Sequence, residues 1–405
     1  MYKPETLELR NRPILPLIAA FFFVLTFAIK ALTDGPYMRG EISSAIAYTK
    51  YVTAFVACFI GTVYMLKAGE KKFVREFNTL TLIAIIFCLV SFGMQLYSGK
   101  FSGSVYNELF KFYMPAVLAY CMLNTLDDDI LNKCMVLILI VSLIGYFIEL
   151  RSLGTSALSI DFEDFNSDTE SSGFSEIALM LVFYFTVTRG SLICLMVSSL
   201  FSLFTFKRLA MLVTLFVLFI RFLVPKIADI KISRKSIFVL KLLTLIFTAI
   251  WIWILLPPQE YLFIDLFGKS PFSFTMGRSA SLRYLYLGGF HSYGYGSASE
   301  TISNAFGVPF EMDLAKIAVE LSPVVAVLFV WLFWDLVGDN FWALIVVGYY
   351  MLNMITSDSL NSNFSFTLAY IVIGVAGYGA SACRHFESPT PDARSALIKE
   401  WKNGD

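Results

Sequence analysis

Residues 237–256, IFVLKLLTLIFTAIWIWILL, form an apolar run that contains a single charge, that of Lys241. A transmembrane α-helix needs roughly 20 predominantly apolar residues, so this run predicts one membrane-spanning helix. Pro257 and Pro258 follow it directly and end the helix, since a proline cannot continue the backbone hydrogen bonding. A connection far longer than any other then runs to about residue 316. A membrane helix that opens onto a long loop therefore sets the fold class.

The composition indicates that the whole chain, and not this segment alone, is a membrane protein. Hydrophobic residues make up 57% of the 405 residues and charged residues 15%, whereas a soluble domain carries about 25% charged residues. The apolar runs have helix length and recur from end to end, which excludes a soluble domain with one anchor and an outer-membrane barrel. The formal net charge of zero gives no field that would attract nucleic acid.

We expect an all-α, polytopic bundle of about twelve transmembrane helices. It forms a single domain over residues 1–383, followed by a cytoplasmic tail at residues 384–405. The connections assigned to the inner side carry about twice as many Lys and Arg residues as the outer ones, which places both termini inside. Two long loops lie outside, at about residues 151–174 and 257–316. The expected helices cover residues 13–32, 44–66, 79–97, 108–124, 134–150, 175–188, 191–206, 209–224, 237–256, 317–337, 341–356 and 364–383.

The second outer loop contains the most unusual sequence, SPFSFTMGRSASLRYLYLGGFHSYGYGSASE at residues 270–300. Positive charge on the outer side is disfavoured by membrane topology, so Arg278 and Arg283 need another explanation. A guanidinium group binds phosphate with two hydrogen bonds in one geometry. On a helix the two arginines would lie about 140° apart, on neighbouring faces. The alternative is a solvent-exposed loop whose arginines serve only to keep it hydrated.

Further charged residues on the outer side are candidates for the same site. Lys207 and Arg208 join two apolar runs without a polar linker, and either bind an anionic headgroup or form a snorkelling interfacial turn. Glu176 lies at the start of an expected helix, on the outer side, and is a candidate to bind an arginine or accept a proton. The alternative is that it only interacts favourably with the helix dipole. His291 is a candidate general base or a neutral loop histidine.

Aromatic residues accompany these charges, and we expect some of them to stack on sugar rings, with an interfacial aromatic belt as the alternative. These are Tyr284, Tyr286, Tyr293 and Tyr295, of which Tyr286 and Tyr293 are the preferred substrate-binding candidates. No metal or cofactor is expected, because the six cysteines lack CxxC spacing and the two histidines fall on opposite sides of the membrane.

The chain resembles the superfamily of O-antigen polymerases (Wzy) and O-antigen ligases. The resemblance rests on the helix number, on the long late outer loop, and on TMGRSASLRYLYLGGFHSYGYG (residues 275–296), which pairs Gly277-Arg278 with a later Gly-x-Gly at 294–296. Three more segments are similar to family patterns and cover much of the last two thirds of the chain: TFKR (205–208), GFSEIALML (173–181) and ITSDSLNSNFSFTLAYIVIG (355–374).

The resemblance implies a GT-C-like, metal-independent glycosyltransferase in the bacterial inner membrane with its active site on the periplasmic side. The donor and the acceptor would be oligosaccharide repeat units linked to undecaprenyl diphosphate, and partners would include the lipid bilayer and possible pathway neighbours, a chain-length regulator and a flippase. Arg278, Arg208 and Arg283 would stabilise the diphosphate leaving group, with Lys207 beside them. Glu176 or His291 would activate the acceptor hydroxyl.

Two alternatives stay open. An O-antigen ligase usually carries a histidine just before the helix that follows the late loop, and residues 302–320, ISNAFGVPFEMDLAKIAVE, contain none, which favours the polymerase. A lipid-linked oligosaccharide flippase or other transporter would place charges in mid-membrane and show interrupted helices in matching halves. Lys50, Lys111 and Lys241 are the candidate charges, and they fall near the ends of expected helices.

Overall fold

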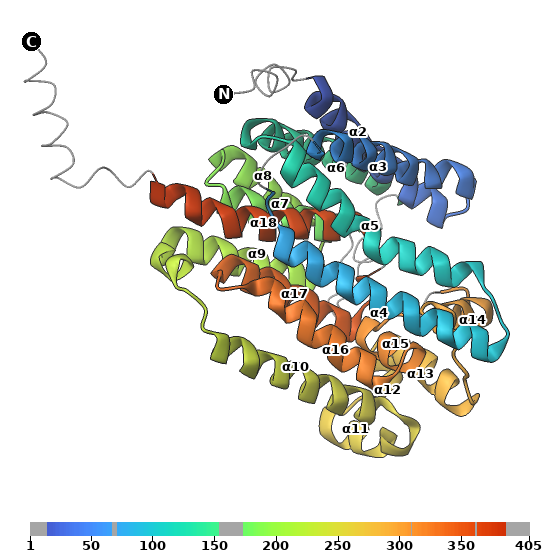
Figure 1. Cartoon of the computed structure of the whole chain (residues 1–405). Coiled ribbons are helices and arrows are strands. Elements are labelled where there is room, and N and C mark those ends of the chain that lie inside the picture. Colours follow the sequence, from blue (N-terminus) through green and yellow to red (C-terminus); the bar gives the residue numbers. More distant parts are fainter. Residues whose placement is uncertain (1–13, 67–70, 154–172, 309, 361–362, 386–405) are drawn as a thin grey trace, which may run out of the picture.

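The computed structural model describes residues 14–66, 71–153, 173–308, 310–360 and 363–385, and every regular element in them is helical (Figure 1). The expected loop at about 151–174 and the tail at 384–405 lie almost entirely outside these residues. The long and medium helices are α2 (Ile14–Met38), α3 (Ser44–Met65), α4 (Val74–Ser98), α5 (Gly103–Thr125), α6 (Asp128–Leu153), α7 (Phe174–Val187), α8 (Leu192–Phe204), α9 (Arg208–Leu223), α10 (Arg234–Leu255), α16 (Pro323–Trp334), α17 (Phe341–Thr356) and α18 (Asn363–His385).

The described helices confirm a helical, membrane-embedded protein. Five of them, α2, α3, α4, α6 and α10, are long and apolar enough to cross a bilayer. The other apolar helices have 17 residues or fewer in their apolar part, which is shorter than the roughly 20 residues that a perpendicular span requires. α5 has 23 residues but carries Glu108 and Lys111. Every apolar run expected from the sequence is helical.

The prediction of one helix over 317–337 is wrong at its start, because the structure divides this segment between two helices. α15 (Asp313–Glu320) ends before Ser322, which has φ 141°, and α16 begins at Pro323. The proline lacks the N–H that would continue the hydrogen bonding of α15, but it is well tolerated at the first position of a helix. The Ser322 hydroxyl accepts a hydrogen bond from the Val325 N–H at 3.2 Å and so caps α16.

The connections between helices gather at two ends of the bundle. At one end, the Lys72 N–H donates to Asn124 Oδ1 at 2.6 Å, and the Ile232 N–H donates to the Asp339 carbonyl at 2.9 Å. These contacts join connections that the charge pattern assigns to the inner side. Connections assigned to the outer side meet one another at the other end, where the Ser102 hydroxyl donates to Glu300 at 2.8 Å. Each of these contacts therefore joins two connections that the charge pattern assigns to the same side.

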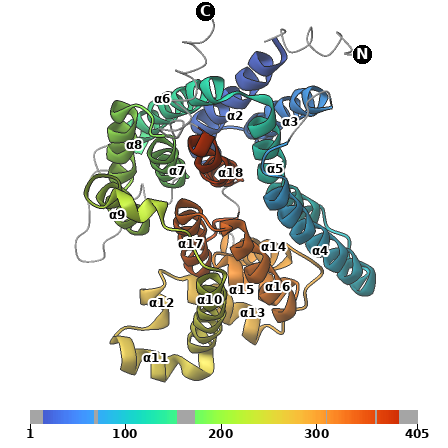
Figure 2. The same cartoon turned by 60° about the vertical axis from the view of Figure 1, so that its left-hand side comes forward.

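The long segment after α10 is folded rather than an extended loop. It contains the 3₁₀ turn Pro257–Gln259 and the short helices α11 (Glu260–Phe267), α12 (Pro271–Phe274), α13 (Arg278–Leu287), α14 (Ser297–Phe306) and α15. In Figure 2, α11 lies beside the end of α10, whereas α14 and α15 lie next to α16 and α17. A second apolar core joins these short helices to the end of α10, formed by Ile254, Leu255, Phe263, Leu282, Leu285, Ala298, Ile302, Phe310, Met312 and Ala315.

Candidate functional site

Glu176 is a buried carboxylate that ties four segments together. It lies in the first turn of α7 and is 3% exposed. Its Oε1 accepts hydrogen bonds from Lys207 Nζ at 3.1 Å and from Asn353 Nδ2 at 2.8 Å, and its Oε2 accepts one from Ser365 Oγ at 2.7 Å. The structure thus joins two residues that the sequence singled out, Glu176 and Lys207. All three hydrogen bonds are directed at the carboxylate, and the ammonium group of Lys207 also balances its charge.

The two arginines of the late segment lie on one helix but face different acids. Arg278 begins α13, directly after Gly277 with φ 87°, and its guanidinium pairs with Glu311. Arg283 Nη1 lies 2.9 Å from Glu260 Oε2, and both side chains are about half exposed. The segment that carries the arginines is helical, and the arginines do not converge on one point in this structure. Exposed pairs of this kind contribute roughly 0–1 kcal/mol, so either partner is readily exchanged for another anion or cation.

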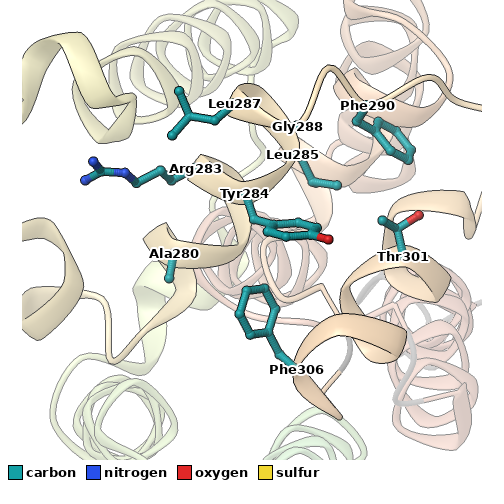
Figure 3. A pocket seen from close by; sticks show the side chains of 9 residues that line it. All are labelled: Ala280, Arg283, Tyr284, Leu285, Leu287, Gly288, Phe290, Thr301 and Phe306. Atoms are coloured by element: carbon teal, nitrogen blue, oxygen red, sulfur yellow. The ribbon is translucent and has the colours of Figure 1, made fainter.

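An open hollow of about 600 Å³ lies between α13 and α14. Figure 3 shows the Tyr284 and Phe306 rings beside each other, and their centroids are 5.2 Å apart in an edge-to-face arrangement. The Arg283 side chain extends away from these rings in the same view, so it stands at the rim. Rings and aliphatic walls with one cation at the edge suit an amphiphilic ligand. The lining residues are Ala280, Arg283, Tyr284, Leu285, Leu287, Gly288, Phe290, Thr301 and Phe306.

The Gly-Tyr-Gly sequence at 294–296 anchors the late segment in the main bundle. Tyr295 is 1% exposed and its ring lies 5.0 Å from that of Phe87 between centroids. Gly296 has φ 99°, and a Cβ there would lie 2.7 Å from Glu108 Cγ. The glycines are therefore required for the close approach to the helices that flank them. The expectation that Tyr295 stacks on a sugar is wrong for this structure, since its ring is enclosed by protein.

The remaining candidates occupy different environments. Tyr293 is buried, and Lys100 Nζ lies 3.6 Å from the centre of its ring. The role of Tyr293 in binding a sugar stays a prediction. Tyr286 is 53% exposed and His291 is exposed, which leaves both available to a ligand. Arg208 is exposed at the start of α9, where it makes an interaction within the protein. The functional roles of Tyr286, His291 and Arg208 stay predictions.

Sequence reasoning missed a buried ion pair between α5 and α15. Lys316 Nζ donates to Glu108 Oε2 at 2.9 Å, and Lys111 Nζ donates to Glu108 Oε1 at 3.1 Å. Lys316 also lies 4.9 Å from the centre of the Tyr295 ring. The signal was present, because a Glu and a Lys near the start of an apolar run must find partners away from lipid. Only the fold shows that the partner of Glu108 is 208 residues away.

Asp313 is a second group that sequence reasoning missed. It is fully buried, and its Oδ2 accepts hydrogen bonds from the backbone N–H groups of Ser359 at 2.6 Å and Leu360 at 2.8 Å. The carboxyl group of Asp358 lies close enough to interact electrostatically with that of Asp313. Burial and the neighbouring Asp358 carboxylate raise the pKa of Asp313 well above its ordinary value.

The third such group is Glu320, which caps α14 from outside that helix. Its Oε2 accepts a hydrogen bond from the Gly296 N–H at 2.7 Å, and its Oε1 accepts from the N–H groups of Ala298 at 2.7 Å and Ser299 at 3.3 Å. A carboxylate at a helix N-terminus satisfies donors that have no partner inside the helix and is favoured by the helix dipole. Glu320 thereby fixes the position of α14 relative to the break before α16.

Among the residues that the structure describes, no group of three or more His, Cys, Asp and Glu side chains is placed to hold a metal ion. The arrangement therefore offers charged and aromatic protein groups for binding. Comparison with known proteins adds no relative, since no protein-family model, no curated protein and no solved structure matches the chain.

Proposed function

We propose that this chain is a surface-polysaccharide polymerase of the O-antigen polymerase type. It would join oligosaccharide repeat units carried on undecaprenyl diphosphate, at the periplasmic face of the bacterial inner membrane and with both termini in the cytoplasm. About twelve membrane passages would be made by the long and the shorter apolar helices together. The chemistry would be a glycosyl transfer in which an acceptor hydroxyl replaces the lipid diphosphate at the anomeric carbon.

One observation carries this proposal: the segment between α10 and α16 folds into short helices that share an apolar core with the end of α10, with a hollow of about 600 Å³ and an arginine at the rim of that hollow. A solvent-exposed loop whose arginines serve only to keep it hydrated needs neither an apolar core nor a hollow. A developing diphosphate charge is stabilised by cations that are positioned in advance. Arg278 and Arg283 are held by single, partly exposed acids, which a ligand phosphate can displace.

The ion pair of Glu176 with Lys207 lies at helix ends that the charge pattern assigns to the outer side, as it does the late segment. It positions Lys207, and with it the start of α9 where Arg208 lies. In this arrangement Glu176 acts mainly by positioning the cations. Proton transfer from the acceptor hydroxyl would fall to a more available group, of which His291 is the exposed candidate.

A second candidate function, a lipid-linked oligosaccharide flippase or related transporter, is favoured by charges in the membrane helices. Asp34 of α2 pairs with Lys30 of the same helix and with Lys50 of α3, and both helices are long and apolar enough to span a bilayer. Ionisable residues inside membrane segments often mark transport pathways. The helix break before Pro323 points in the same direction.

The test is a surface-polysaccharide gel of a deletion strain complemented with the wild type, with Arg278→Ala or with Arg39→Ala. Arg39 is a matched control, since it also pairs with a nearby acid, Glu41, in a connection assigned to the outer side. A polymerase predicts that the deletion and Arg278→Ala collapse the ladder to lipid core bearing one repeat unit, while Arg39→Ala keeps it. The expected loss of rate for Arg278→Ala is about 10²–10³-fold.

The same gel separates the alternatives. Uncapped core with polymer accumulating on the lipid carrier indicates a ligase. Loss of both polymer and single repeat units, with lipid-linked units retained on the inner leaflet, indicates a flippase. A normal ladder in the deletion strain contradicts all three functions.

A further inference from the structure

The outward face of α11 and α12 is covered with large apolar side chains. Tyr261 is 84% exposed, Leu266 60% and Phe272 61%. Five more large apolar residues in this short stretch are exposed, namely Leu262, Ile264, Phe267, Phe274 and Met276. A contiguous apolar surface of this kind is rare on a face that contacts water, and it marks a site of interaction with protein or lipid.

The opposite face of the same two helices is apolar as well. Phe263 of α11 is fully buried, and its ring lies 5.4 Å from that of Phe274 and 6.5 Å from that of Trp251 between centroids. It belongs to the second apolar core. A helix that is apolar on its packed face and on its free face is typical of an apolar environment on both sides.

The free face of α11 and α12 continues the exposed surface of α10. α10 is one of the five helices suited to span a bilayer, and only 17% of its apolar window is buried, the smallest share of the five. Its exposed residues near α11 include Phe247, Ile250 and Trp253. Both views place α11 at the periphery beside the end of α10 (Figures 1 and 2). The medium that covers α10 therefore also reaches α11.

Charged residues lie within and beside this surface. Asp265 is exposed and lies four residues after Tyr261, on the same outward face of α11, and Lys269 is exposed just after the helix. Glu260 at the start of α11 pairs with Arg283. A face that carries large apolar side chains together with charges matches the boundary between acyl chains and headgroups, where amphipathic helices lie parallel to the membrane. Continuity with α10 identifies the occupant as lipid rather than a soluble partner.

We propose that α11 and α12 lie in the outer boundary of the lipid bilayer beside α10, with Tyr261, Leu266 and Phe272 in contact with lipid. The proposal does not depend on the enzymatic function. It has a consequence for the hollow between α13 and α14, because Arg283 lines that hollow and is paired with Glu260 of α11. The hollow then opens at the lipid boundary, where an amphiphile with an apolar chain and an anionic headgroup would meet it.

Photo-crosslinking in native membranes tests the proposal. We would replace Phe272 and, separately, Tyr261 with p-benzoylphenylalanine, irradiate, purify the full-length protein and measure attached phospholipid by mass spectrometry. Ile250→p-benzoylphenylalanine on α10 is the positive control, and Lys133→p-benzoylphenylalanine, in an exposed position with an i,i+4 ion pair near the start of α6, is the control outside lipid. Leu266 is the second position on α11 if the Tyr261 variant fails to accumulate.

The proposal predicts lipid adducts at Phe272 and Tyr261 within about two-fold of those at Ile250, and at least ten-fold above those at Lys133. Adducts to a second copy of the chain in place of lipid would show that the face is a dimer interface, and would overturn the proposal. Adducts at Ile250 alone would show that α11 and α12 face water, with the same consequence.

Discussion

Lys316 and Glu108 form an ion pair inside the protein, with 2.9 Å between Nζ and Oε2, and the Lys316 side chain is completely buried. The pair is asymmetric. Glu108 has a second partner in Lys111, whereas Lys316 donates a hydrogen bond to Glu108 alone within the described part of the chain. Removing one member of a buried pair is costly because the other is left charged and unpaired. Which member is removed must therefore matter.

We predict that Glu108→Gln destabilises the protein more than Lys316→Met. The first change leaves Lys316 charged in a dry site and is expected to lower the free energy of unfolding by about 3–5 kcal/mol. The second leaves Glu108 paired with Lys111 and costs less. The double variant should be more stable than Glu108→Gln alone. Thermal unfolding in one detergent, followed by circular dichroism, measures all three, and an equal or reversed order of the single variants would contradict this account.

Gly296→Ala should destabilise the protein more than Gly289→Ala. Both glycines have positive φ, 99° and 60°, so alanine is strained at either site. At Gly289 no atom lies within 4 Å of the added methyl group, and the expected cost is about 1–2 kcal/mol. At Gly296 the methyl group meets Glu108 Cγ at 2.7 Å, so α5 and the late segment must separate. Equal unfolding temperatures for the two variants would show that the contact is not needed.

Glu300 gives a prediction about pH. Partial burial alone would raise its pKa, but hydrogen bonds from Ser104 and Ser102 lower the pKa of this carboxyl group overall, below its ordinary value of 4.5. A lowered carboxyl pKa stabilises the fold above the ordinary pKa, and this contribution is lost as pH falls through the folded-state pKa. Glu300→Gln should therefore be less stable than the wild type at about pH 7 and equally stable at about pH 3.

Unfolding in a denaturant series at stepped pH measures the Glu300 effect. Ser104→Ala serves as the matched variant, since it removes one donor to the carboxylate and should produce the same trend with a smaller amplitude. A difference between Glu300→Gln and the wild type that stays constant with pH would refute the role of the charge.

The Glu176–Lys207 pair should behave as a positioning contact. Glu176→Ala leaves Lys207 and Asn353 without their acceptor in a buried site, and we expect a loss of about 3–5 kcal/mol in unfolding free energy. Adding Lys207→Met should recover part of that loss, because no unpaired charge then remains. A double-mutant cycle reports the coupling between the two side chains. Additive effects of the two changes would mean that the pair does not contribute as a unit.

The sequence predicted the helical membrane architecture because long apolar runs leave few alternatives. Run 237–256 became α10 almost unchanged. The prediction from the sequence was wrong at residues 317–337, because the hydropathy continues across Ser322. Only the backbone geometry at Pro323 shows the break. Helical structure around Arg278 was foreseen as a possibility, but the core that organises the late segment was not, since it depends on contacts between short helices.

The candidate site was predicted in part. Glu176 and Lys207 were singled out separately for their position at the outer helix ends, and the structure joins them. The environment of Tyr295 was not predicted, because an aromatic residue in a glycine-rich loop has the same sequence pattern whether it is exposed or inserted into a bundle. The pairing of Lys316 with Glu108 was not predicted, because it depends on a contact between residues 208 positions apart in the sequence.

The most direct test of the central claim is an assay of the purified protein in liposomes with one lipid-diphosphate-linked repeat unit, isolated from the deletion strain, as both donor and acceptor. Mass spectrometry would follow the glycan on the lipid. The account predicts lipid-linked products with two or more repeat units, released lipid diphosphate, and a loss of about 10²–10³-fold in rate for Arg278→Ala but not for Arg39→Ala. Substrate that remains a single repeat unit with properly folded wild-type protein would contradict the assignment as a polymerase.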